Sequence, residues 1–217
     1  SYRNSVIYAI DHSAAAIRQA VIELGERREA AVKFIQGDAA SLAEKVREKV
    51  DAVIYCNSIH YVPDKEKLIS QIKQALRPGG TLSFNTSFFE GSQPPESLEF
   101  YRRWMMRSLR ILKREYGLRA VRSEKVASRK QLTADEYSDL LVSQGFKVDK
   151  TDVMKVDVPL EGWVDISGYS DFIEGVMPGV PMDKASASLQ RGAREIYEER
   201  GFSSVRRHWL GIVATRV

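Results

Sequence analysis

The chain has 217 residues, of which 43% are hydrophobic, and a formal net charge of +4. This length and apolar content predict one α/β domain with an elaboration, or two small domains, and exclude a disordered chain. The single cysteine, Cys56, excludes a disulfide framework, and the absence of a long apolar run or a leader predicts a soluble, cytoplasmic protein.

Helices and strands alternate through the first half of the chain. Near-continuous apolar runs predict strands over residues 5–10, 31–36, 50–56 and 81–88, and the first of these strands is expected to be buried. Helical patterns separate them, over residues 13–26, 42–50 and 64–76. The segment "LRPGG", residues 76–80, stops the third helix with the proline and glycine typical of a helix end. This alternation predicts a parallel sheet covered by helices on both faces.

A basic segment follows the turn-rich connector "EGSQPPES". From Arg102 to Lys130 it holds eleven lysine or arginine residues and two acidic ones. Apolar side chains recur in it at steps of three or four, which predicts a helix with one apolar face. The residues of this face are Leu98, Tyr101, Met105, Leu109, Leu112 and Tyr116.

The rest of the chain continues the alternation. Thr133 and Glu136 have the spacing of a capping box, which predicts a helix over residues 134–144, closed by Gly145. A strand is expected over 146–159, and "HWLGIVATRV" is expected to end the chain as another strand. Between these strands lies a long mixed segment.

Unusual polar residues follow the predicted strands. Asp11 follows the first strand, and Gly37 and Asp38 follow the second. In a doubly wound sheet the ligand lies at the carboxyl ends of the strands. An acid at the first position can accept hydrogen bonds from both hydroxyls of a ribose, although Asp11 could equally cap the helix that follows it.

Four stretches together carry a family resemblance: "YAIDHSAAAI", "FIQGDAASL", "DAVIYCNSIHYVPDKEKLISQIKQALRPGGTLSF" and "HWLGIVATRV". In their order and spacing they resemble class I S-adenosylmethionine-dependent methyltransferases, and most of all the small-molecule enzymes of the UbiE-like or type 11 group. The resemblance implies an α/β fold with a doubly wound (Rossmann-like), mostly parallel sheet, helices on both faces, an antiparallel final strand and a helical cap.

The resemblance also implies a division of the chain. Residues 1–91 and 132–217 would form the methyltransferase core, residues 92–131 a basic helical insertion, and residues 160–207 a lid within the core. The family's glycine-rich loop has no counterpart before residue 5. We expect that an upstream segment of the natural protein supplies this loop, in preference to a non-catalytic remnant.

The cofactor implied by the resemblance is S-adenosyl-L-methionine, with S-adenosyl-L-homocysteine as product. Asp11 would bind the ribose hydroxyls, and His12 would lie beside the adenosine. Asp38, helped by the backbone of Ala39, would bind the adenine amine, and Gly37 would let the chain turn close to the base. A simple turn between strand and helix also explains the pair Gly37–Asp38.

Further residues are assigned to the methionine end of the cofactor and to the acceptor. Asn57 and Ser58 would contact the methionine part. His60 is the candidate general base, because the pKa of a histidine lies near neutrality, although it could instead orient the substrate. Substrate contacts are expected from Tyr61, Trp163 and Tyr169, of which the last two could also be ordinary packing residues of the cap.

The function expected from this resemblance is methyl transfer to a small-molecule acceptor, on oxygen, nitrogen or carbon. Two alternatives are a nucleic-acid-binding or RNA-modifying protein that uses residues 102–130, and a nicotinamide-dependent oxidoreductase. We expect neither nucleic acid nor a membrane as a partner, and we expect no metal site, because His12, His60 and His208 are scattered.

Overall fold

The computed structural model describes residues 5–25, 31–121 and 131–217, which form two compact units. Unit 1 comprises Ser1–Asn85, Ala134–Thr151 and Gly211–Val217, and unit 2 comprises Thr86–Thr133 and Asp152–Leu210. The predicted basic insertion and the predicted lid therefore both belong to unit 2. Among the described residues, no helix combines the length and the apolar character needed to cross a membrane.

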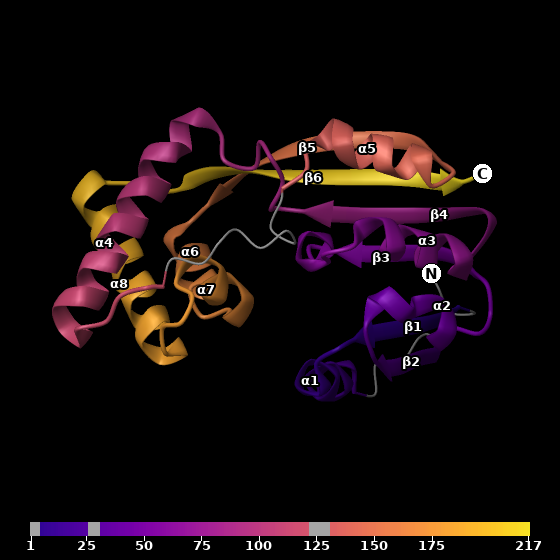
Figure 1. Cartoon of the computed structure of the whole chain (residues 1–217), viewed down its shortest axis with the longest axis horizontal. Helices are drawn as coiled ribbons and strands as arrows, with labels where there is room; N and C mark the ends of the chain where they lie inside the picture. Colours follow the sequence, from indigo (N-terminus) through magenta and orange to yellow (C-terminus); the bar gives the residue numbers. More distant parts are fainter. Residues whose placement is uncertain (1–4, 26–30, 122–130) are drawn as a thin grey trace. The chain divides into compact units, whose positions relative to one another are not determined.

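Unit 1 follows the predicted alternation of strands and helices (Figure 1). Three strands, β4 (Leu76–Thr86), β5 (Phe146–Val158) and β6 (Val205–Arg216), contribute residues to both units. The remaining elements of unit 1, in chain order, are β1 (Val6–Asp11), α1 (Ala14–Leu24), β2 (Ala31–Gln36), the 3-10 turn η1 (Ala39–Ser41), α2 (Leu42–Lys45), β3 (Val50–Cys56), the 3-10 turn η2 (Ile59–Tyr61), α3 (Lys65–Ala75) and α5 (Ala134–Ser143).

Capping residues set several of these boundaries. The Ser13 hydroxyl accepts a hydrogen bond from the Ala16 amide at 3.2 Å and starts α1. The Asp64 carboxylate accepts one from the Lys67 amide at 2.9 Å and starts α3. Both side chains satisfy amides of a first helical turn, which have no partner within the helix. Gly145, at φ 79°, follows α5 in the left-handed region where glycine is favoured.

The described strands form two sheets. One contains β1 and β2 in parallel, and the other has the order β3-β4-β6-β5, with β3 and β4 parallel. The last strand runs antiparallel to its neighbours, as expected, and its arrow in Figure 1 points opposite to that of β4. Accordingly, the Arg216 guanidinium donates to the Leu76 carbonyl, and the Val217 amide donates to the Gly145 carbonyl at 3.2 Å.

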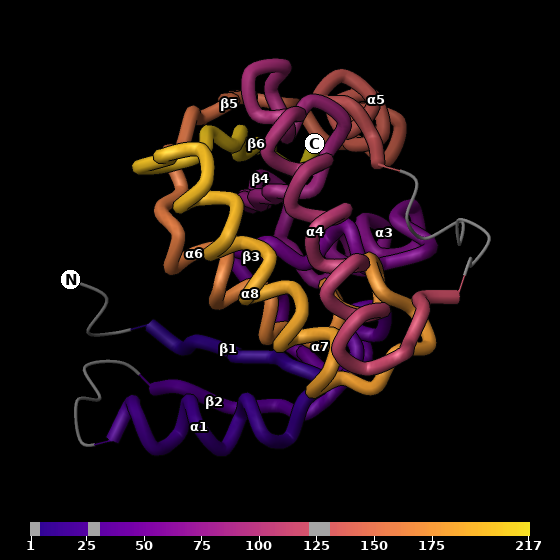
Figure 2. The backbone as a smooth tube through the Cα atoms, turned by 90° about the vertical axis from the view of Figure 1, so that its left-hand side faces the viewer, coloured from indigo at the N-terminus to yellow at the C-terminus, as the bar shows by residue number. Residues whose placement is uncertain are grey.

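The prediction that the first strand is buried is wrong. Val6 and Ile7 in β1 are 51% and 45% exposed, and no residue of α1 is buried. In the described structure β1 pairs only with β2, and α1 lies along this pair (Figure 2). With a single strand partner and a single covering helix, the β1–β2 pair leaves much of its apolar surface in contact with solvent.

Two other boundaries also differ from the predictions. The helix expected over residues 42–50 is only the four-residue α2, which ends at Lys45. The segment 76–80 lies inside β4 rather than in a loop, although α3 does end at Ala75. A shift in the β3–β4 register between Val50 and Ala52 accommodates this start, and Gly79 adopts φ 75°. A bulge of this kind allows proline and glycine within a strand.

The core of unit 1 lies on the four-stranded sheet. It is built from fully buried side chains of α3, β4, α5 and β6, with exposed fractions of 2% or less: Leu68, Ile69, Ile72, Leu82, Phe84, Tyr137, Leu141, Ile212 and Ala214. The Tyr137 ring lies 5.4 Å from the Phe84 ring, and burial raises the pKa of its hydroxyl. Helix and sheet therefore share one apolar core at this place.

Unit 2 is mainly helical. Its helical elements are the 3-10 turn η3 (Pro95–Ser97), α4 (Leu98–Tyr116), α6 (Leu160–Ile166), α7 (Ser170–Val176) and α8 (Met182–Arg200). Helices α4 and α8 lie side by side in both views (Figures 1 and 2). Their apolar faces enclose a core rich in aromatic rings, with Phe100, Trp104 and Trp163 at its centre.

The basic helix is present, but its predicted apolar face is rotated. The buried residues of α4 are Phe100, Trp104, Ser108, Ile111 and Leu112. Of the predicted face, only Leu112 is fully buried, whereas Leu98 and Leu109 are exposed. The inner face includes a polar residue, Ser108, which lies against Gly192 of α8 and which an apolar pattern does not mark as buried. Four basic residues of the segment, Arg122, Lys125, Arg129 and Lys130, lie outside the described residues.

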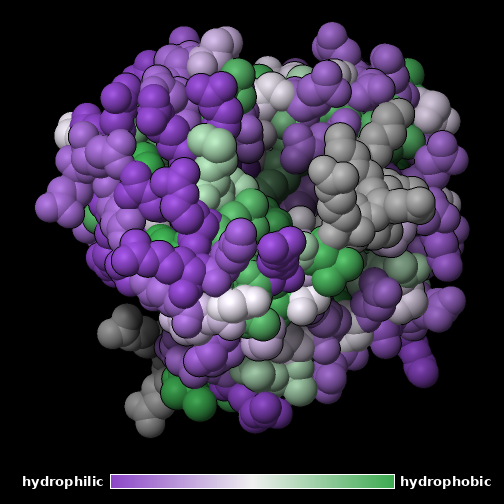
Figure 3. Space-filling view, turned by 60° about the vertical axis from the view of Figure 1, so that its left-hand side comes forward, coloured by the Kyte–Doolittle hydropathy of each residue, from purple (hydrophilic) through white to green (hydrophobic). Residues whose placement is uncertain are grey.

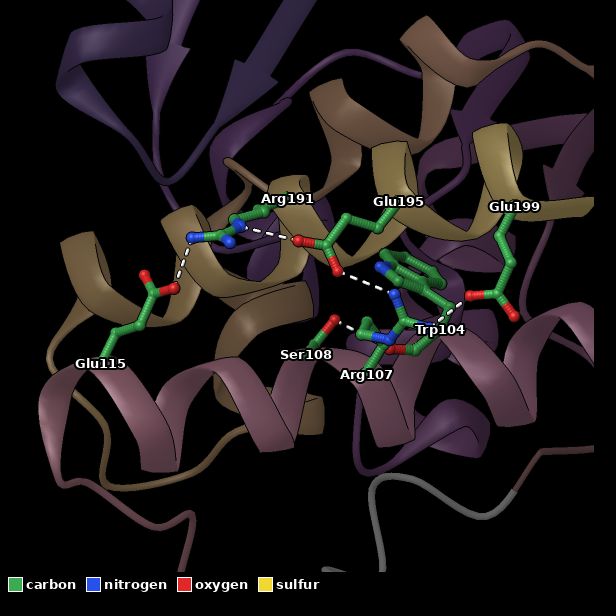
Figure 4. A network of polar contacts seen from close by, with 7 residues as sticks. All are labelled: Trp104, Arg107, Ser108, Glu115, Arg191, Glu195 and Glu199. Atoms are coloured by element: carbon green, nitrogen blue, oxygen red, sulfur yellow. Dashed lines mark hydrogen bonds and ion pairs between the residues drawn. The ribbon is translucent and has the colours of Figure 1, made fainter.

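Arginines of α4 and α8 are held by acids of the facing helix (Figure 4). Arg107 donates to the carboxylates of Glu195, at 2.8 Å, and Glu199. Arg191 of α8 pairs with Glu195 at 2.8 Å and with Glu115 of α4. The hydrogen bonds with Glu195 and Glu199 raise the pKa of Arg107. Part of the basic charge predicted from the sequence is therefore paired within the protein. The face of the molecule drawn in Figure 3 is mostly hydrophilic, with hydrophobic residues between.

The close crossing of α4 and α8 yields a stability prediction at Gly192. A β-carbon at this position would lie 2.2 Å from the Ser108 hydroxyl oxygen and 3.2 Å from the Ser108 amide nitrogen. We expect Gly192→Ala to lower the free energy of unfolding by about 1–2 kcal/mol in urea denaturation, because overpacking outweighs the better helix propensity of alanine.

Two variants control this experiment. Gly175→Ala in α7 adds the same methyl group where no atom lies within 4 Å, and it should be neutral or slightly stabilising. Ser108→Ala removes the hydroxyl that the new methyl group meets, so Gly192→Ala should cost less in that background. Equal costs in both backgrounds would show that the Ser108 hydroxyl is not the obstacle.

Candidate cofactor and acceptor site

Parallel pairing brings the ends of β1 and β2 together. Their register places Asp11 beside Gln36, and the Gly37 amide donates to the Asp11 carbonyl at 2.9 Å. The loops after the two strands therefore start from one edge of the sheet, as predicted for a ligand site at the carboxyl ends of parallel strands. Asp11 and Asp38 stand at the starts of these two loops.

Asp11 is both a cap and an accessible acid. Its carboxylate accepts a hydrogen bond from the Ser13 amide at 2.7 Å, which orients the side chain at the start of α1. The side chain nevertheless remains 48% exposed. The neighbouring His12 ring is 83% exposed, with Nδ1 3.7 Å from the Asp11 carboxylate. The two interpretations of Asp11 from the sequence are thus compatible, because a carboxylate has more lone pairs than one cap uses.

Asp38 is oriented by the turn that follows it. Its carboxylate accepts a hydrogen bond from the Ala40 amide at 2.8 Å and caps η1, which begins at Ala39. At Gly37, a β-carbon would lie 2.1 Å from Cε of Lys45. The absence of a side chain there leaves room for the Lys45 chain, and the glycine permits this close approach.

The loop after β3 has an unusual backbone. Asn57 adopts φ 44°, a positive value that no other non-glycine residue among those described has. Its amide donates to both the carbonyl and the side-chain oxygen of Asn85, each at 3.0 Å. Asn85 was missed by the sequence reasoning, although a polar residue near the end of the apolar strand "TLSF" was an available signal. Positive φ in a loop held by two hydrogen bonds is typical of functional sites.

The Tyr55 hydroxyl lies near residues that follow both β2 and β3. Burial raises the pKa of its hydroxyl, a hydrogen bond with Ser58 lowers it, and the nearby Asp38 carboxylate raises it. The hydroxyl thus lies beside one predicted residue from each of two loops. Tyr55 was missed because the sequence pattern marks it only as an ordinary residue of the strand over 50–56.

His60 and Tyr61 occupy the short turn η2. Both side chains are partly buried, and their ring centroids are 4.1 Å apart. The Tyr61 amide donates to the Ser58 carbonyl at 3.0 Å, which fixes the turn. The structure thus keeps the predicted base, His60, next to the predicted methionine contacts Asn57 and Ser58.

The two predicted substrate residues of unit 2 occupy different environments. Trp163 is 3% exposed and packs with its ring 5.3 Å from that of Tyr101. Tyr169 precedes α7 and is 48% exposed. Neither residue lines the cavity of unit 2 whose wall contains Phe88, Tyr101 and Phe172.

The chemistry of the strand ends fits a nucleoside. A ribose diol offers two hydroxyl donors and an adenine amine offers two N–H donors, and the carboxylates of Asp11 and Asp38 are acceptors on adjacent loops. The backbone around both acids is fixed by their own capping bonds. The donor set therefore agrees with an adenosine-containing cofactor.

Comparison with known proteins relates the chain to methyltransferases. Residues 1–82 match a family model described as a methyltransferase domain. Phosphoethanolamine N-methyltransferase 2 of Caenorhabditis elegans is 25% identical over 170 residues, covering 75% of this chain and 39% of the relative. The chain thus spans well under half the length of this relative.

Solved structures share the whole fold. A Bacillus halodurans protein assigned as a methyltransferase superimposes with a TM-score of 0.60 at 16% identity, covering 98% of this chain and 83% of the other. An S-adenosylmethionine-dependent methyltransferase of Methanosarcina mazei gives a TM-score of 0.51 at 17% identity, with 98% and 82% covered. The match over residues 1–82 is to a methyltransferase domain, in agreement with the resemblance seen in the sequence, and these solved structures share the fold of the chain.

Proposed function

We propose that this chain binds S-adenosylmethionine and directs its methyl group to a small-molecule acceptor. The observation that carries the proposal is the parallel pairing of β1 and β2, which puts Asp11 next to the Gly37–Asp38 turn. This pair of loops lies within the stretch that matches the methyltransferase-domain family. The name of the curated relative, which specifies phosphoethanolamine, supports an acceptor of small size.

Each residue of the strand ends has a proposed role at the cofactor. Asp11 binds the ribose hydroxyls, with His12 beside the adenosine, and Asp38 binds the adenine amine. The cofactor's sulfonium supplies an activated methyl group when bound, so the protein's main contribution is to position the acceptor in line with it. Asn57 and Ser58 hold the methionine part, supported by the hydrogen bonds of Asn57 to Asn85.

His60 is proposed as the base for acceptors that must lose a proton. Its partly buried ring lies one turn from Asn57 and Ser58, beside Tyr61. A histidine can take a proton near neutral pH and pass it to solvent. Tyr61, Trp163 and Tyr169 are proposed to contact or position the acceptor, Trp163 from within the core.

Calorimetric titration of S-adenosylhomocysteine tests the cofactor site. We expect Asp11→Ala to weaken binding about tenfold or more, because two charge-assisted hydrogen bonds to the ribose are lost. Asp11→Asn keeps an acceptor for the Ser13 amide but has only one acceptor oxygen, so it should weaken binding without loosening the start of α1.

Asp51→Ala is the matched control. Asp51 lies near the amino end of β3, where it pairs with Arg77 at 2.5 Å, and its loss should leave cofactor binding unchanged. Titration with NADH tests the oxidoreductase alternative. If NADH binds more tightly than S-adenosylhomocysteine, that alternative is favoured. No binding of S-adenosylhomocysteine to the unchanged chain would contradict the proposal.

A further inference from the structure

Unit 2 contains a cavity of about 310 Å³ that the proposed cofactor residues do not use. Aromatic rings from three parts of the chain line it: Phe88 from the segment after β4, Tyr101 and Trp104 from α4, and Phe172 from α7. The volume is at the small end of the range for ligand pockets. The cavity therefore suits a compact molecule with a large apolar surface.

The aromatic walls are held in fixed orientations. The Trp104 indole N–H donates to the Leu189 carbonyl at 2.8 Å, and the side chain is 1% exposed. Its ring is nearly parallel to that of Phe172, with centroids 5.8 Å apart and an interplanar angle of 15°. Parallel rings that are fixed in this way favour a flat ligand, because a planar ring can stack in the same direction.

A rigidly held cation forms another part of the wall. Arg207 is 6% exposed and donates to the Ser87 carbonyl from Nε at 3.0 Å and from Nη2 at 2.5 Å. Its Nη1 donates to the Tyr101 hydroxyl at 3.2 Å, and the guanidinium lies 4.5 Å from the centre of the Phe88 ring. These contacts therefore hold the Arg207 guanidinium in one position in the cavity wall.

The polar groups of the cavity are complementary to an anion. Arg102, an exposed residue of α4, also lines it, and none of the described lining residues is acidic. Burial raises the pKa of the Tyr101 hydroxyl, which keeps it protonated at neutral pH. Because this hydroxyl accepts its bond from Arg207, its own proton can be donated to a ligand.

We propose that this cavity binds the methyl acceptor, and that the acceptor is a planar aromatic molecule carrying a carboxylate or a similar negative charge. The identification of the ligand as the acceptor rests on the proposed function, whereas the binding of such a molecule does not. The aromatic rings of the wall provide the stacking surface. Arg102 and the Tyr101 hydroxyl bind the negatively charged group of the ligand. A cationic amine is disfavoured, because two arginines would repel it.

Three probe molecules test the class of ligand. 2-Naphthoate, 2-naphthylmethylammonium and phosphoethanolamine are titrated into the chain by calorimetry and by quenching of tryptophan fluorescence. We expect 2-naphthoate to bind about tenfold or more tightly than the ammonium compound, since they share the ring system and differ in charge. Tighter binding of either amine would overturn the proposal.

Matched variants locate the probe. Arg102→Gln should weaken 2-naphthoate about tenfold, whereas Arg110→Gln, at an exposed position two turns further along α4, should not. Trp104→Phe should reduce the quenching clearly, whereas Trp209→Phe, in β6, should retain it. Unchanged binding in Arg102→Gln would overturn the assignment of the anion site.

Titration of S-adenosylhomocysteine on the same samples separates the two proposals. Cofactor binding that depends on Asp11, without any binding of 2-naphthoate, would refute the acceptor class and leave the proposed function standing. Binding of 2-naphthoate without cofactor binding would refute the proposed function instead. Circular dichroism of Trp104→Phe and Arg102→Gln shows whether each variant is folded.

Discussion

Replacement of Trp104 by alanine is expected to destabilise unit 2 by about 3–5 kcal/mol. The indole is 1% exposed and has three aromatic neighbours, the rings of Phe100, Trp163 and Phe172, with centroids between 5.5 and 5.8 Å away. Truncation removes these contacts and leaves a cavity that the surrounding rings cannot close without moving. It also leaves the Leu189 carbonyl without its side-chain donor.

Hydrogen exchange measures this loss where it arises. Protection of the α4 and α8 amides reports the free energy with which unit 2 opens, and it should fall by the stated amount. Met106→Ala is the matched control, because Met106 lies on the same helix but is 52% exposed, so its effect should stay within about 0.5 kcal/mol. Equal effects of the two variants would show that the aromatic core does not hold these helices together.

Local pattern was sufficient for most of the secondary structure. β2 and β3 have the predicted bounds, and Ser13 and Gly145 act as the predicted start and stop of helices. These features depend on a few neighbouring residues, so a single sequence contains their cause. The capping bond of Ser13, for example, involves only residues 13 and 16.

Features that depend on partners far along the chain were missed. The apolar pattern predicted the wrong buried face of α4, because the pattern does not show that Ser108 is buried against Gly192 of α8. It also read the first strand as buried, since an apolar run does not reveal how many strands will pair with it. The spacing of apolar residues is a local property of the sequence, whereas burial depends on which other elements pack against a helix or strand.

The candidate site divides in the same way. The acids at the strand ends were recognisable because each follows an apolar run, and parallel pairing alone brings Asp11 and Asp38 to one edge. Asn85 and Tyr55 were not, because their roles come from contacts with loops elsewhere in the chain. The cavity of unit 2 is even harder to predict from the sequence, because its wall depends on a bond between Arg207 and the Ser87 carbonyl, which are 120 residues apart in the chain.

Arg207→Met is expected to destabilise unit 2 by about 2–4 kcal/mol, because it removes both guanidinium hydrogen bonds to the Ser87 carbonyl and takes the cation from the Phe88 ring. Replacing a buried ion pair by apolar residues can be neutral when both partners are replaced. Here the acceptor is a backbone carbonyl, which no substitution removes, so the methionine cannot compensate. Thermal denaturation and exchange of the β6 amides measure the loss.

Arg207→Lys shows whether the positive charge of Arg207 or the geometry of its guanidinium stabilises unit 2. Lysine keeps the positive charge but has no planar fork with which to bind the Ser87 carbonyl twice and reach the Tyr101 hydroxyl. We therefore expect an intermediate loss of about 1–2 kcal/mol, together with a clear weakening of 2-naphthoate, because the Tyr101 hydroxyl is no longer oriented. A lysine variant that matches the wild type in both measurements would show that the cavity needs only a positive charge at this position, and that the bidentate bond to Ser87 does not shape the wall.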